Sequence, residues 1–208
     1  MQKRILFLLD ESGSMGSMAR EAIGGFNAWK KALELVENDV RITVVTFNEG
    51  TPRIVYNDVP VRKVPDMTLN DFHPDNMTAL YDAIAWSIDH VDRKMQQDDS
   101  ALVVILTDGE ENASRHTSHD MVRKMITDRQ TKGWAFSFLS SDLDAVETAQ
   151  RMGIARSDTV YFEPDQRGMA TAYAAITTAS MTYLSGERED QSTWQQVVEN
   201  NTSTVKTR

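Results

Sequence analysis

The chain has 208 residues, of which 40% are hydrophobic, so it can bury one substantial core. Its formal net charge of -9 argues against a nucleic-acid partner, because affinity for that backbone comes largely from Lys and Arg, and it favours a cation or a basic surface. The sequence contains no cysteine, which excludes disulfides, thiolate metal sites and cysteine nucleophiles and agrees with a reducing compartment.

The N-terminus is basic, like the start of a signal peptide, but its apolar run is short. Only Ile5 to Leu9 separate the basic residues from Asp10. Such a run is shorter than the apolar region of a signal peptide and much shorter than a membrane span. We therefore expect a cytoplasmic protein with no membrane partner.

Short apolar runs alternate with segments of helical period along the chain, and this alternation predicts an α/β fold with a mainly parallel sheet. The runs predicted to be strands cover residues 5–9, 42–47, 102–106, 135–139 and 159–162. Residues 54–56 are expected to form the partner of an edge hairpin. The strands before Asp10 and Asp108 are apolar without alternation, which is typical of central strands buried on both faces.

Three segments carry apolar residues at a spacing of three or four, so each predicts a helix with one buried face. The stripes are Met18, Ala22, Phe26, Trp29, Leu33 and Val36; Leu80, Ile84, Ile88, Val91 and Met95; and Ala172, Ile176, Ala179 and Tyr183. Residues 57–77 are polar and contain Pro60, Pro65 and Pro74, which indicates a long loop. Beyond residue 186 the sequence becomes polar.

Acidic and hydroxyl side chains follow the predicted central strands. Asp10, Ser12 and Ser14 alternate after the first strand, and Asp108 follows another. Thr78 stands just before a helix, at the end of the long loop. In open α/β sheets, ligands bind at the carboxyl ends of strands where the strand order reverses. Oxygen ligands without His or Cys suit Mg²⁺, Mn²⁺ or Ca²⁺ and do not suit zinc or copper.

This constellation resembles the von Willebrand factor type A family and its metal-ion-dependent adhesion site. Asp10, Ser12 and Ser14 in "DESGS" match its Asp-x-Ser-x-Ser loop, Thr78 in "MTALYDAI" its Thr, and Asp108 in "LTDGE" its Asp. The segment "FLSSDLDAVETAQRMGI" is similar to the late strand and helix of bacterial and phage members. One departure is that Asn76 and Met77 precede Thr78, where relatives often have Gly-Gly.

The resemblance implies a doubly wound, Rossmann-like fold: a mainly parallel six-stranded sheet with helices on both faces and one short antiparallel edge strand. It covers roughly residues 4–186, so we expect a domain over residues 1–186 followed by a polar tail over residues 187–208.

The resemblance also implies that the domain is a metal-dependent protein-binding module. Ser12, Ser14 and Thr78 would bind the cation directly, and Asp10 and Asp108 would act largely through water. A partner protein would supply a Glu or Asp to an open coordination position. Members of the family also occur with AAA+ ATPase systems, so such an association is allowed, although no residue here selects it.

Each singled-out residue also has a plainer interpretation. Ser12 and Ser14 are common in turns that cap a helix. Glu11, Glu110 and Glu111 are expected to form a solvated acidic rim rather than to act as ligands. His116 and His119 are expected to flank a helix start made by Thr117 and Asp120, which resemble a capping box. Asp142 and Asp144 are expected to serve as turn or cap residues.

Two other functions use the same site. A metal-dependent hydrolase would use Glu111 or His116 as base, but the sequence has neither a G-x-S-x-G nor a G-x-x-x-x-G-K-[ST] motif, so we expect no enzyme. A self-assembling structural protein would use the site to join copies of this chain.

Overall fold

Six strands form one sheet in the order β3-β2-β1-β4-β5-β6 in the computed structural model, which describes residues 2–36 and 39–186. All neighbouring strands pair in parallel except β2 and β3, which pair antiparallel at one edge. This confirms the predicted doubly wound sheet. The strands are β1 (Lys3–Asp10), β2 (Val40–Phe47), β3 (Arg53–Pro60), β4 (Ser100–Thr107), β5 (Ala135–Ser140) and β6 (Thr159–Tyr161).

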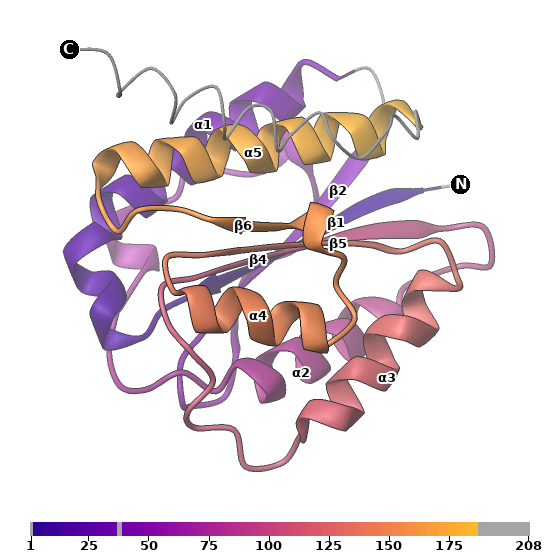
Figure 1. Ribbon diagram of the computed structural model, residues 1–208. Coiled ribbons are helices and arrows are strands. Elements are labelled where there is room, and N and C mark those ends of the chain that lie inside the picture. Colours follow the sequence, from indigo (N-terminus) through magenta and orange to yellow (C-terminus); the bar gives the residue numbers. More distant parts are fainter. Residues whose placement is uncertain (1, 37–38, 187–208) are drawn as a thin grey trace, which may run out of the picture.

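Helices cover both faces of the sheet (Figure 1). α1 and α5 pack on one face, and α2, α3 and α4 pack on the other. Most residues of the predicted apolar stripes lie in α1, α2 and α5 and face the core, as their spacing requires. Met18, Val36 and Met95 lie just outside α1 and α2, and Ala179 is half-buried. The helices are α1 (Ala19–Glu34), α2 (Leu80–Asp92), α3 (His119–Gln130), α4 (Leu143–Arg151) and α5 (Gln166–Ser185).

The edge strand β3 is longer than its sequence suggests. Only residues 54–56 were expected to be extended, but β3 has 8 residues, the same length as β1. The polar pair Asn57 and Asp58 interrupts its apolar pattern, and Asp58 adopts a positive φ of 54° where the pairing with β2 shifts register. The expected loop over residues 57–77 therefore begins only after Pro60, and it contains short 3₁₀ turns at Val61–Lys63 and Leu69–Asp71.

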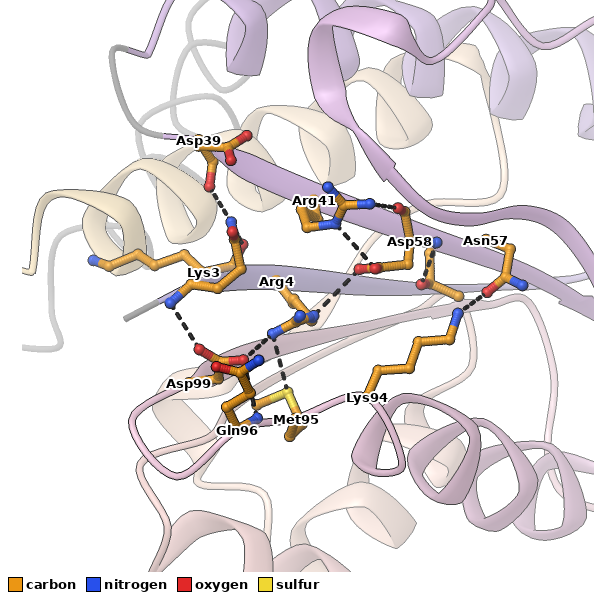
Figure 2. A network of polar contacts seen from close by, with 12 residues as sticks. Lys3, Arg4, Asp39, Arg41, Asn57, Asp58, Lys94, Met95, Gln96 and Asp99 are labelled. Atoms are coloured by element: carbon orange, nitrogen blue, oxygen red, sulfur yellow. Dashed lines mark hydrogen bonds and ion pairs between the residues drawn. The ribbon is translucent and has the colours of Figure 1, made fainter.

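A network of alternating charges joins the amino ends of β1 and β2 to the carboxyl end of the antiparallel β3 (Figure 2). Arg4 Nε lies 3.2 Å from Asp58 Oδ1, and the same guanidinium also pairs with Asp99. Arg41 Nε lies 3.0 Å from Asp58 Oδ2. Because each charge has an opposite partner, these groups tolerate their partial burial. Asp58 ties β3 to β2 through Arg41 and to β1 through Arg4, and Arg4 also reaches Asp99 just before β4.

α1 and α5 approach each other closely at Gly25. The buried Tyr173 of α5 donates a hydrogen bond of 2.8 Å to the carbonyl of Ala22, and its ring occupies the space beside Gly25. A Cβ atom built on Gly25 would lie 2.0 Å from a carbon of that ring. A Cβ built on the neighbouring Gly24, which is exposed, meets nothing within 4 Å.

This pair of glycines supplies a matched test of the helix packing. Gly24→Ala should stabilise the protein by about 0.5–1 kcal/mol, because Ala costs less backbone entropy in a helix. Gly25→Ala should destabilise it by about 1–3 kcal/mol, because the added methyl group overpacks a buried ring. Urea unfolding of both variants measures the difference. Equal effects of the two substitutions would contradict the close α1–α5 contact.

The end of α5 is fastened to the start of β1. Lys3 Nζ donates hydrogen bonds of 2.8 Å to the carbonyls of both Tyr183 and Leu184, and so caps the last turn of the helix. Gly186 follows with a left-handed φ of 75°, a conformation that favours glycine at the end of a helix. The polar tail expected over residues 187–208 lies outside the described residues.

We propose that residues 1–186 form the complete domain. A chain that ends after Gly186 should melt in a single cooperative transition close to that of the full chain, because the α5 cap and both core clusters are made by residues up to that point. Circular dichroism of the two chains during heating tests this. A broad or strongly lowered transition in the shorter chain would show that the tail contributes to the core.

Candidate functional site

Four of the five predicted ligands, Asp10, Ser12, Ser14 and Asp108, converge where the strand order reverses. β1 lies between β2 and β4, so the connections from β1 and β4 leave the sheet toward opposite faces. Open α/β sheets bind ligands at such a position, and we call the place between the carboxyl ends of these two strands the crevice. Asp10 is the last residue of β1, and Asp108 directly follows β4. The parallel pairing of β1 with β4 therefore places the two carboxylates side by side at the carboxyl ends of these strands.

Two hydroxyl groups and one carboxylate meet in this crevice. Ser14 Oγ donates a hydrogen bond of 2.8 Å to Asp108 Oδ1, and Ser12 Oγ lies 3.4 Å from the same oxygen. The two serine hydroxyls lie 3.3 Å apart. Ser12 stands at the N-cap of a 3₁₀ turn (Gly13–Met18) but makes no side-chain capping bond there. Its hydroxyl points to Asp108 instead, so the plainer helix-cap interpretation of Ser12 is wrong.

Asp10 lies behind these groups and is fully buried. Its Oδ1 accepts a hydrogen bond of 2.7 Å from the Ser12 amide, and its Oδ2 accepts one of 2.5 Å from Thr107 Oγ1. Burial raises the pKa of Asp10 to about 6, although both hydrogen bonds act in the opposite direction. Burial also raises the pKa of Asp108. The crevice thus holds two carboxylates whose charges a cation would stabilise.

Backbone hydrogen bonds hold the loop of Thr78 against the loops that follow β1 and β4. Its amide donates a hydrogen bond of 2.9 Å to Asn112 Oδ1, and its carbonyl accepts bonds from the amides of Asn112 and Ala113. The carbonyl of Asn76, two residues earlier, accepts a bond of 3.0 Å from the amide of Gly13. The loops that carry Thr78, Asp108 and the two serines are thereby joined. Within the described residues, no hydrogen bond links the Thr78 hydroxyl to the other four predicted ligands.

Glu111 anchors a loop and is not part of a solvated rim. Its carboxylate accepts bonds from the amides of Tyr81, Ala113 and Ser114 at 2.7–2.9 Å and from Ser114 Oγ at 2.6 Å. Tyr81 lies in the first turn of α2, whose own N-cap residue, Ala79, offers no side-chain acceptor. Glu111 therefore completes the N-terminus of α2 from a neighbouring loop.

Glu11 also departs from the expected rim. It is only 5% exposed, pairs with Arg53 at 2.7 Å and accepts a hydrogen bond from the amide of His73. Sequence reasoning missed the roles of Glu11, Glu111 and Asn112. Their positions in the loops that follow β1 and β4 were the available signal. Of the three predicted rim residues, Glu110 alone is exposed.

The predicted capping box at Thr117 and Asp120 is wrong. The N-cap of α3 is Ser118, whose side chain accepts from the amide of Met121. The amides of His116 and Thr117 instead donate to the carboxylate of Asp82, and His119 Nδ1 lies 3.3 Å from Asp120.

Asp142 has the expected cap role, because it accepts bonds from the amides of Asp144 and Ala145 at the start of α4. Ligand atoms of Glu110, Asp142 and Asp144 lie within 4.8 Å of one another. None of these belongs to the predicted set of ligands, and two of them are exposed.

The donor set of the crevice fits a hard divalent cation. Ser12, Ser14 and Asp108 offer only oxygen atoms, and the buried carboxylate of Asp10 adds negative charge behind them. Neutral hydroxyls and carboxylates are ligands that Mg²⁺, Mn²⁺ and Ca²⁺ accept. In the described part of the chain, no helix combines the length and the apolarity needed to cross a lipid bilayer.

A family model for the von Willebrand factor type A domain matches residues 5–175. The chain therefore belongs to the von Willebrand factor type A family, as the motifs predicted. A search of curated proteins found no match.

Solved structures of low identity share the fold. Proximal thread matrix protein 1 from the mussel byssus is 14% identical with a TM-score of 0.60, and the match covers 86% of this chain and 46% of that one. For the PilB minor pilin from Streptococcus sanguinis the identity is 12%, the TM-score 0.65 and the coverage 88% and 62%. For manganese-loaded TRAP protein from Plasmodium vivax the values are 14%, 0.61, 88% and 73%. The chain thus spans about half the length of the mussel protein.

The neighbouring residues Glu110 and Glu111 provide a matched test of the loop anchor. Glu111→Gln should lower the free energy of unfolding by about 1–3 kcal/mol, because the amide keeps one acceptor oxygen and loses the charge that serves several donors. Glu110→Gln should change it by less than about 0.5 kcal/mol, because that side chain is exposed. Urea unfolding in EDTA measures both, and an equally small effect of Glu111→Gln would contradict the anchor.

Proposed function

We propose that this domain binds a divalent cation through Asp10, Ser12, Ser14, Thr78 and Asp108 and uses it to capture a carboxylate of a partner protein. The observation that carries the proposal is the meeting of two serine hydroxyls with the Asp108 carboxylate in front of buried Asp10. These groups come from separate parts of the sequence and converge at the crevice of the sheet. A bound divalent cation would supply an electrophilic position for an oxygen of the partner.

The chain's own residues leave such a position attractive to an anion. Ser12, Ser14 and Thr78 are neutral, so they contribute ligand oxygens without cancelling the charge of a cation. Both oxygens of Asp10 already accept hydrogen bonds, which favours an action of Asp10 through water rather than by direct contact. The remaining positive charge at the crevice would then favour an acidic side chain over a neutral one.

Family membership supports a binding role. Domains of this family commonly act as metal-dependent protein-binding modules, and the TRAP structure was loaded with manganese. We propose Mg²⁺ as the cation, with Mn²⁺ or Ca²⁺ as substitutes of similar ligand preference. The proposed partner is a protein that presents a Glu or Asp. An AAA+ ATPase system is one such setting that the family allows, and a cytoplasmic location fits the lack of cysteine.

Two other functions make different predictions. A hydrolase would need a free base near the cation, but the carboxylate of Glu111 is committed to the hydrogen bonds that anchor α2. A self-assembling structural protein is suggested by the mussel thread matrix protein and by the pilin. It would show metal-dependent association of this chain alone, which sedimentation in Mg²⁺ and in EDTA measures.

Carboxylate capture can be tested with a small probe. We expect that N-acetyl-glutamate amide, added to the ¹⁵N-labelled chain in Mg²⁺, shifts amide resonances of residues 11–17, 75–79 and 108–113. The glutamine analogue, or the same titration in EDTA, should leave them unchanged. The affinity of one carboxylate should be weak, about millimolar, because a single contact offers little binding energy.

Ser14→Ala should abolish these shifts, since it removes a proposed ligand. Ser17→Ala is the matched control, because Ser17 Oγ only donates to the Ser14 carbonyl at 3.2 Å in the same exposed turn. Asp108→Ala should also abolish the shifts but remain folded in EDTA, because burial already disfavours its charge. Equal shifts with and without EDTA would show that the carboxylate does not bind through a cation, which would refute the proposal.

A further inference from the structure

Thr107, the last residue of β4, makes a hydrogen bond that the proposed ligand set does not include. Its side-chain oxygen lies 2.5 Å from Asp10 Oδ2, and the residue is fully buried. The register of the sheet produces this contact. Leu9 pairs with Leu106 in the parallel β1–β4 ladder, so Asp10 and Thr107 come next to each other at its end, with their side chains on the same face.

The direction of the hydroxyl proton follows from the neighbours of Thr107. Gly109 N donates to Thr107 Oγ1 at 3.2 Å, so the oxygen already serves as an acceptor. The hydroxyl has one proton to donate, and the Asp10 carboxylate at 2.5 Å is a closer and more strongly charged acceptor than the Gly109 carbonyl at 3.1 Å. A chain of hydrogen bonds thus runs from Gly109 through Thr107 to Asp10.

Thr107 and the Ser12 amide together fix both oxygens of Asp10. The Ser12 amide holds Oδ1 from the side of the serine turn, and Thr107 holds Oδ2 from β4. Because Asp10 is fully buried, bulk solvent does not reach Oδ2 on the side of β4 to replace the Thr107 donor. The plane of this carboxylate, and hence the direction of its charge toward Ser12, Ser14 and Asp108, is set by these donors.

We propose that Thr107 is a positioning residue of the metal site: it holds the Asp10 carboxylate in the orientation that favours a cation, without contacting the cation itself. This inference rests on the proposed function for its effect on cation affinity. The contact between Thr107 and Asp10 does not depend on that function. The two parts can therefore be tested separately.

The chain offers a matched control for removal of the hydroxyl. Thr46 is also a fully buried threonine near the carboxyl end of a strand, and its Oγ1 has no hydrogen-bond partner among the described residues. It lies on β2, paired with Leu9 of β1. Thr107→Val and Thr46→Val therefore make the same chemical change on the two strands that flank β1, but only the first removes a donor to Asp10.

Calorimetric titration with MnCl₂ tests the effect on the cation. Thr107→Val should weaken Mn²⁺ binding about 10- to 100-fold, the usual loss when a group that orients a ligand is removed. Thr107→Ser, which restores the hydroxyl, and Thr46→Val should both bind close to wild type. Undiminished binding by Thr107→Val, or binding by Thr107→Ser as weak as that of Thr107→Val, would overturn the inference.

A second measurement in EDTA needs no cation. The ¹³C resonance of the Asp10 carboxyl group should move in Thr107→Val, return toward its wild-type position in Thr107→Ser and stay in place in Thr46→Val. A resonance unchanged in Thr107→Val would overturn the positioning role. If the wild-type chain binds no Mn²⁺ while the resonance moves as expected, the proposed function fails and the positioning of Asp10 by Thr107 stands.

Discussion

The parallel pairing of β1 with β4 is the constraint on which the site depends. These central strands bury both faces, so their register is fixed by the core on either side of the sheet. The register in turn determines that Asp10 meets Thr107 and that Asp108 follows one residue later. A shift of either strand by one residue would move buried leucines toward the opposite face and separate the polar groups. The packing of the core and the geometry of the crevice are therefore specified together.

The crevice gathers negative charge in a place that solvates it poorly. Burial raises the pKa of both Asp10 and Asp108, so each charge opposes folding at neutral pH. The fold offsets part of this cost with donors from Ser12, Ser14 and Thr107. A site that retains such a conflict while its surroundings are well packed is typical of a functional position rather than a structural one.

The sequence predicted the features that depend on local pattern. The uninterrupted apolar run of β1 and the stripe from Met18, just before α1, to Leu33 each indicate burial directly. The likeness to solved structures confirms the fold. The alternation of Asp10, Ser12 and Ser14 indicated oxygens at one strand end. Features that depend on partners far away in the sequence could not be predicted from local pattern. Glu111 reads as an exposed acid until the N-terminus of α2 is placed beside it, and β3 continues through Asn57 only because β2 supplies its partner.

The clasp between Lys3 and the last turn of α5 has a topological consequence. Lys3 Nζ reaches the carbonyls of Tyr183 and Leu184. The start of β1 and the end of α5 therefore lie beside each other, as Figure 1 also shows. A unit whose entry and exit points are adjacent can be spliced into a surface loop of a host protein without stretching that loop. The same closure permits circular permutation with a short linker, which would leave the crevice, at the opposite end of the sheet, undisturbed.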